Sequence, residues 1–125
     1  MKLFDLLNEE EGQLILGDVM RGVHRNNYTL VIDALANRLP PNSDTRERLI
    51  KILNSKKSKI IAHILKMIKN EREKYYYNMW FLPGAVMMLR RLVPDWPELN
   101  IIYKSMKAEP DRYKKYSGQT IHWDD

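Results

Sequence analysis

The residues with the clearest chemical potential in this chain are cations that are followed directly by aromatic rings. Positions 46–74, here called the basic segment, contain ten Lys or Arg and three acidic residues, a net charge of about +7, whereas the whole chain carries +5. Positions 75–81 then hold five aromatic residues. Cations bind phosphates, and aromatic rings stack on bases. The pattern therefore predicts a polyanion, specifically nucleic acid, as a partner.

The cations expected to contact phosphates lie on two predicted helices that meet near Asn54 and Ser55. They are Arg46, Arg48, Lys51, Lys56, Lys57, Lys59, Lys66 and Lys69. The lysines of the second helix lack acidic residues one turn away, which a merely solvated helix face often supplies. The alternative is that they form only such a solvated face. Lysine outnumbers the side chains that read base edges, so we expect phosphate contacts with little sequence specificity.

The aromatic residues beyond the basic segment have two interpretations, a hydrophobic core or a partner interface. Three consecutive tyrosines spread over about 200° of a helix, so at least one of them should be exposed. This leads to a second hypothesis, a protein-binding adaptor or a structural subunit of a larger assembly, for example a viral one. The interface of such an adaptor, or of a homo-oligomer, would contain Tyr75, Tyr76, Tyr77, Trp80 and Trp123.

Other chemistries find no support in the residues present. The chain has no cysteine, and its three histidines are far apart, without a carboxylate at metal-ligand spacing. It has no nucleophile elbow, phosphate loop or dinucleotide fingerprint. We therefore expect no enzyme, no cofactor and no metal. The first residues lack the apolar core of a signal peptide, and no apolar run reaches the roughly 18–20 residues of a membrane span. These features indicate a cytoplasmic protein, or one in a host cytoplasm.

A second pair of cations, Arg90 and Arg91, suits recognition of phosphate or carboxylate, or else neutralises the end of a predicted helix. The pair belongs to residues 84–96, GAVMMLRRLVPDW. This segment resembles one near the end of phage small terminase subunits, where a helix with a basic residue runs into a proline and a tryptophan. Such proteins are oligomeric, helical and bind DNA. The resemblance implies a DNA-binding oligomer of phage or mobile-element origin.

Helical spacing of apolar residues dominates the chain and predicts an all-α fold. Possible capping boxes start at Asn8 and Asp44, and Asn54-Ser55 either interrupts a helix or is bridged by it. The two helices around that junction have the scale of a helix-turn-helix motif, although the junction lacks the usual glycine. We expect one bundle-like domain of five or six helices over residues 1–110, followed by an extended C-terminal arm over residues 111–125.

Three packing expectations follow. First, Gly12, Gly17 and Gly22 either weaken the first helix or let another helix approach it closely. Second, one face of the helix that follows Lys56 is buried and the opposite face is exposed. The buried face would contain Ile61, Ile64, Leu65 and Ile68, and the exposed face Lys59, His63, Lys66 and Asn70. Third, Ile121 and Trp123 are apolar in a polar tail, so the arm should dock on the domain or on a second copy.

Overall fold

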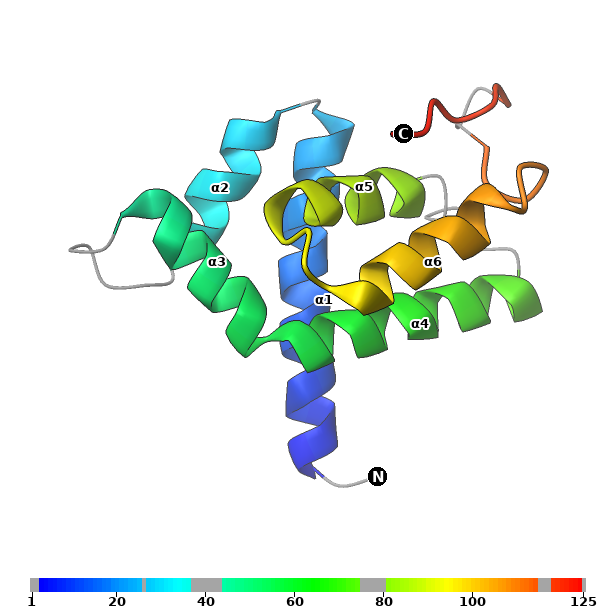
Figure 1. The fold of residues 1–125 in the computed structure, drawn as a ribbon. Helices are drawn as coiled ribbons and strands as arrows, with labels where there is room; N and C mark the ends of the chain where they lie inside the picture. The colour runs from blue at the N-terminus through cyan, green and yellow to red at the C-terminus, as the bar shows by residue number, and fades with distance from the viewer. Residues whose placement is uncertain (1–2, 26, 37–43, 75–80, 115–117, 125) are drawn as a thin grey trace.

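Helix α1 (Leu3–His24) is the longest element, and the other helices are arranged around it (Figure 1). The structure, a computed structural model, describes residues 3–25, 27–36, 44–74, 81–114 and 118–124. Within these ranges five further helices follow: α2 (Tyr28–Ala36), α3 (Thr45–Ser55), α4 (Lys57–Lys74), α5 (Leu82–Leu92) and α6 (Pro97–Lys107). The described residues contain no strand, only an isolated antiparallel bridge between Lys114 and Thr120. The predicted all-α fold is confirmed.

The helix ends are set by local chemistry. The Asp44 carboxylate caps α3 by accepting the backbone N–H of Arg46 at 3.0 Å, as the capping box predicts. Prolines stand in the first turns of α5 and α6, where their missing N–H costs no helical hydrogen bond. The capping box predicted at Asn8 is wrong, because α1 already begins at Leu3.

The junction between α3 and α4 is a single residue, Lys56. The Lys56 N–H still donates to the carbonyls of Ile52 and Leu53, at 3.1 and 3.2 Å, so the hydrogen bonds of α3 continue up to the bend. The buried Trp96 fixes this bend by donating its indole N–H to Oδ1 of Asn54 at 2.8 Å. A helix-turn-helix motif needs a turn of three or four residues, which this bend does not provide.

Two glycines of α1 allow neighbouring helices to approach its backbone. A Cβ atom at Gly12 would lie 2.7 Å from the Lys59 carbonyl carbon of α4 and 3.3 Å from the His63 Cβ. A Cβ atom at Gly22 would collide with the Val31 side chain of α2. Gly17, in contrast, has open space around it. The close approach expected from these glycines is therefore confirmed at positions 12 and 22.

The orientation of α4 differs from the expected one. Ile60 and Ile64 are fully buried, which confirms the prediction for Ile64, but Leu65 is 51% exposed. Lys59 and His63, which were expected to face solvent, are half-buried. The cause is the crossing with α1, which contacts α4 on the Lys59 and His63 side. That crossing turns Leu65 outward. Asn70 lies among the residues whose side chains the structure does not describe.

The C-terminal arm docks on its own chain. Tyr113, at its start, is buried in the core, and Ile121 and Trp123 pack against that core as half-buried side chains. The Trp123 ring meets the Tyr103 ring of α6 edge to face, with centroids 5.6 Å apart. This confirms the expected docking and assigns it to the domain.

The two glycine environments give a matched test of the α1–α4 crossing. We expect Gly12→Ala to lower the free energy of unfolding by about 1–3 kcal/mol, because the new methyl group meets the backbone of α4. Gly17→Ala should leave it unchanged or raise it by up to about 1 kcal/mol, since alanine is the better helix former and nothing is displaced. Urea denaturation of the two variants measures the difference. An equal effect of both substitutions would contradict the crossing.

Candidate nucleic-acid interface

The fold divides the cations of the basic segment into an inner group, which is paired, and an outer group, which is exposed. The inner group is Lys56, Lys57 and Lys59. Glu11 of α1 accepts hydrogen bonds from Lys56 Nζ at 3.0 Å through both carboxylate oxygens, and it also accepts one from Lys59 Nζ. Lys57 Nζ lies 2.9 Å from Glu98 Oε2 at the start of α6. The inner lysines thus tie the α3–α4 bend to α1 and α6.

The lysines near the start of α4 have no acidic residue one turn away, as expected, but the fold supplies acidic partners from α1 and α6. Glu11 is separated from Lys56 by 45 residues and from Lys59 by 48, so helical spacing could not reveal it. The hydrogen bond from Lys59, and then that from Lys56, lowers the pKa of Glu11 below its ordinary value. The same contact raises the pKa of Lys59. The inner lysines are therefore held as structural cations.

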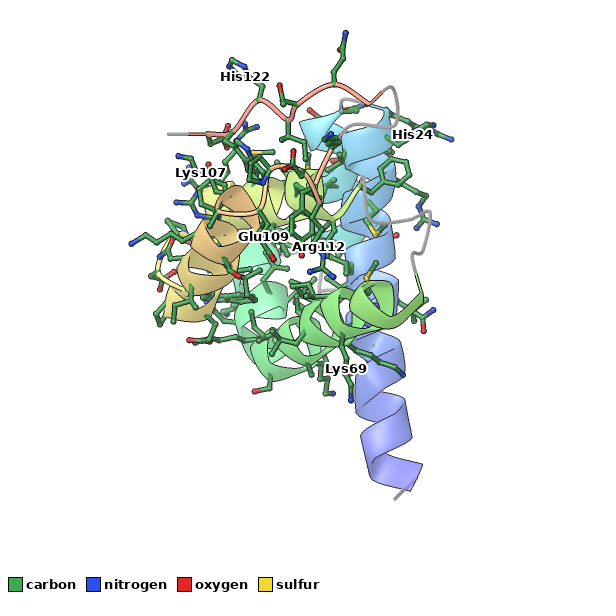
Figure 2. All side chains as sticks on the ribbon, turned by 90° about the vertical axis from the view of Figure 1, so that its right-hand side faces the viewer. His24, Lys69, Lys107, Glu109, Arg112 and His122 are labelled. Atoms are coloured by element: carbon green, nitrogen blue, oxygen red, sulfur yellow. The ribbon has the colours of Figure 1, made fainter. Side chains whose placement is uncertain are left out.

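The outer group consists of Arg46 and Lys51 on α3 and Lys66 and Lys69 on α4, all exposed. Arg46, Lys51 and Lys69 make no ion pair with any residue that the structure describes. Lys69 lies below α4 in Figure 2, on the side of that helix away from the C-terminal arm. The remaining candidate, Arg48, is half-buried. The outer group thus offers positive charge to solvent on both sides of the bend at Lys56.

The aromatic candidates fall into two sets. Tyr75, Tyr76, Tyr77 and Trp80 lie outside the described residues. Trp123 is half-buried against Tyr103 within the same chain.

A second group of cations gathers around one tyrosine ring. This Tyr103 cluster comprises Tyr103 and Lys107 of α6 with Arg90 and Arg91 of α5. The Arg90 guanidinium carbon lies 3.8 Å from the centroid of the Tyr103 ring, and Lys107 Nζ lies 5.9 Å from it. Both distances are within the range of a cation–π interaction. The sequence shows the arginine pair but not the ring on which Arg90 stacks, because α5 and α6 meet only in the folded chain.

The arm supplies a carboxylate to this cluster. Arg91 donates from Nε and Nη2 to the two carboxylate oxygens of Asp124, at 2.9 and 2.7 Å. The Tyr103 hydroxyl donates to the Asp124 backbone carbonyl. The hydrogen bonds from Arg91 lower the pKa of Asp124. Of the roles open to the arginine pair, carboxylate binding is the one that Arg91 performs here, and the carboxylate belongs to its own chain.

A cavity of about 390 Å³ connects the two regions of positive charge. It lies between α2, α3 and α5, with Ile32, Leu49 and Leu92 among its apolar lining residues. Arg46 of the outer group and Arg91 of the Tyr103 cluster both line it. A ligand that contacts Arg46 is therefore within reach of the edge of the Tyr103 cluster.

The chain matches no family model, no curated protein and no solved structure. No family match therefore supports the resemblance of residues 84–96 to small terminase subunits. Within the described ranges, no group of three or more metal-binding side chains comes together, and no helix is long and apolar enough to cross a bilayer.

The Glu11 pairing predicts an acid-sensitive contribution to stability. The pKa of Glu11 is lowered in the folded state, so its stabilising effect is complete above about pH 4.5 and is lost as the pH falls through the lower folded value. We expect Glu11→Gln to lower the melting temperature by a few degrees at pH 7. The difference from wild type should shrink on acidification toward pH 3.

Asp33→Asn serves as the control, because Asp33 is an exposed carboxylate on α2. Thermal melts followed by circular dichroism compare the three proteins across this pH range. If Glu11→Gln and Asp33→Asn behave alike at every pH, the pairing of Glu11 with the inner lysines contributes nothing to stability.

Proposed function

We propose that this chain is a small helical nucleic-acid-binding protein that contacts phosphates through the outer group and reads little sequence. The observation that carries the proposal is the exposure of Arg46, Lys51 and Lys69 without an ion pair in the described part of the chain. The protein acts by binding and not by catalysis. An oligomeric state and a phage or mobile-element origin belong to the same proposal, through the resemblance of residues 84–96 to small terminase subunits.

The division of the cations supports this proposal physically. The carboxylates of Glu11 and Glu98 form ion pairs with the inner lysines, so they do not neutralise the outer group. Each exposed cation that contacts a phosphate releases a condensed counterion, which is the main driving force of non-specific binding. Exposed arginine and lysine side chains need only small movements to reach a phosphate. We therefore infer that affinity depends on the outer group more than on the inner group.

The salt dependence of DNA binding tests this inference. For four phosphate contacts from the outer group, the slope of log affinity against log salt should be about −3 to −4 on duplex DNA. The triple variant Arg46→Gln, Lys51→Gln, Lys69→Gln should retain a slope of about −1, with much weaker binding at low salt. Fluorescence anisotropy with a duplex of arbitrary sequence measures both quantities.

A control with the same loss of charge separates a local effect from a global one. Arg25→Gln, Lys104→Gln, Lys114→Gln removes three exposed cations outside α3 and α4. This control should bind DNA nearly as well as wild type. If wild type fails to bind at low salt, or if the two triple variants lose affinity equally, the outer group is not a nucleic-acid interface.

The alternative function is a protein-binding adaptor or structural subunit. Three large apolar side chains favour it, since Leu14, Leu65 and Ile101 are 61%, 51% and 68% exposed. An adaptor of this kind would self-associate, or hold a protein partner, at salt concentrations that abolish nucleic-acid binding. Sedimentation at high salt, with and without nuclease treatment, distinguishes the two functions.

A further inference from the structure

The Arg91–Asp124 contact places an acidic group of the chain on a cation that is shaped to bind phosphate. A guanidinium fork that holds two carboxylate oxygens presents the same pair of donors to two phosphate oxygens. The distances of 2.9 and 2.7 Å show that the fork is fully engaged by Asp124. The carboxylate therefore occupies the position that a phosphate would take.

Asp124 lies beside more than one cation. Arg91 lowers the pKa of the Asp124 carboxyl through its hydrogen bonds, and the charge of Arg90 acts in the same direction. Lys107 lies over the same Tyr103 ring as Arg90. Figure 2 shows His122 on the arm and Lys107 on α6 on the same side of the molecule. When the arm leaves, the Tyr103 cluster loses the contact with the Asp124 carboxylate, and Arg90, Arg91 and Lys107 stay with α5 and α6.

The Tyr103 cluster is also continuous with the surface proposed to bind nucleic acid. Arg46 and Arg91 line one cavity, so the two cations border the same space. Asp44 lines the same cavity, but its carboxylate accepts the Arg46 backbone N–H and caps α3. The Asp124 carboxylate holds the Arg91 guanidinium, so a phosphate that binds there has to displace it.

The contacts that hold the arm are suited to exchange. The Arg91 and Asp124 side chains are 57% and 34% exposed, and partly exposed ion pairs add little to stability. Ile121 and Trp123 are half-buried, so they anchor the arm only in part. A nucleic acid offers many phosphates, and each phosphate contact releases counterions, which favours binding. The single Asp124 carboxylate of the arm has no comparable gain, so a nucleic acid can displace it.

We propose that the Tyr103 cluster is a second phosphate-binding site, that Asp124 of the arm occupies it in the free protein, and that nucleic acid displaces the arm. This inference rests on the proposed function, because the displacing ligand is the polyanion that binds the outer group. The arm then acts as an internal competitor that weakens binding until enough phosphates engage the outer group.

The test compares two substitutions that change the net charge equally. Asp124→Asn removes the carboxylate from Arg91, while Asp111→Asn removes an exposed carboxylate of the same arm, which pairs with Lys114 at the longer distance of 3.9 Å. We expect Asp124→Asn to bind an arbitrary DNA duplex about three- to tenfold more tightly than Asp111→Asn at low salt. The slope of log affinity against log salt should also be steeper, by the amount that about one additional phosphate contact contributes. Trp123→Ala, which loosens the arm but keeps Asp124, should also raise affinity.

Arg91→Gln makes the test specific to the site. In the wild-type background it should change affinity little, because the substitution removes the phosphate contact of Arg91 and, at the same time, the Asp124 contact that competes with it. Combined with Asp124→Asn, it should abolish the gain. Circular dichroism melts of all variants establish that the helical domain is intact before the affinities are compared.

Each outcome decides between the two proposals. If wild type binds DNA and Asp124→Asn binds no better than Asp111→Asn, the arm is not a competitor, although the outer group remains the interface. If Arg91→Gln weakens wild type as strongly as it weakens Asp124→Asn, Arg91 binds phosphate with the arm in place and the displacement is wrong. If neither wild type nor Asp124→Asn binds DNA, both the proposed function and this inference are wrong.

Discussion

The close crossing of α1 and α4 is the constraint on which the rest of the structure depends. It combines a missing side chain at Gly12 with a carboxylate at the adjacent Glu11. The absent Cβ lets the two backbones approach, and the carboxylate then lies near the first turn of α4, where Lys56 and Lys59 bind it. Steric fit and charge pairing therefore act at one place and fix the rotation of α4 about its own axis.

This rotation decides which cations remain available to a ligand. A helix turned differently about its axis would expose Lys59 and bury Leu65, and the basic segment would be one continuous face. The observed rotation instead divides the cations of the basic segment between two roles. Lys56, Lys57 and Lys59 join helices, and the outer group faces solvent. The proposed interface is thus a product of helix packing as much as of composition.

Local signals in the sequence predicted most of the fold, while contacts between distant residues limited the prediction of the site. The cap at Asp44 and the prolines at the starts of α5 and α6 act within one helical turn, so the sequence alone indicates where these helices begin. The start of α1 was misjudged because the helix continues past Asn8 toward the N-terminus.

The errors in the candidate site have one physical origin. Glu11 and Lys59 are 48 residues apart, and Arg91 and Asp124 are 33 residues apart. No periodicity within a helix connects such pairs, so the sequence showed the lysines without their acidic partner and the arginines without their carboxylate. The docking of Trp123 was predictable because an apolar side chain in a polar tail needs a surface, but its position on Tyr103 was not.

The central place of α1 has a consequence for the order in which the chain folds. Helix α1 is synthesised before the other described helices, yet it packs against α4 and α5, which come much later in the chain. Among the described helices, α2 follows soon enough to cover part of α1 early. Contacts between segments far apart in the chain slow folding, because the intervening chain must be ordered before they form. The apolar residues of α1 that face α4 and α5 therefore stay exposed until those helices have been made, and such exposed apolar surface favours aggregation.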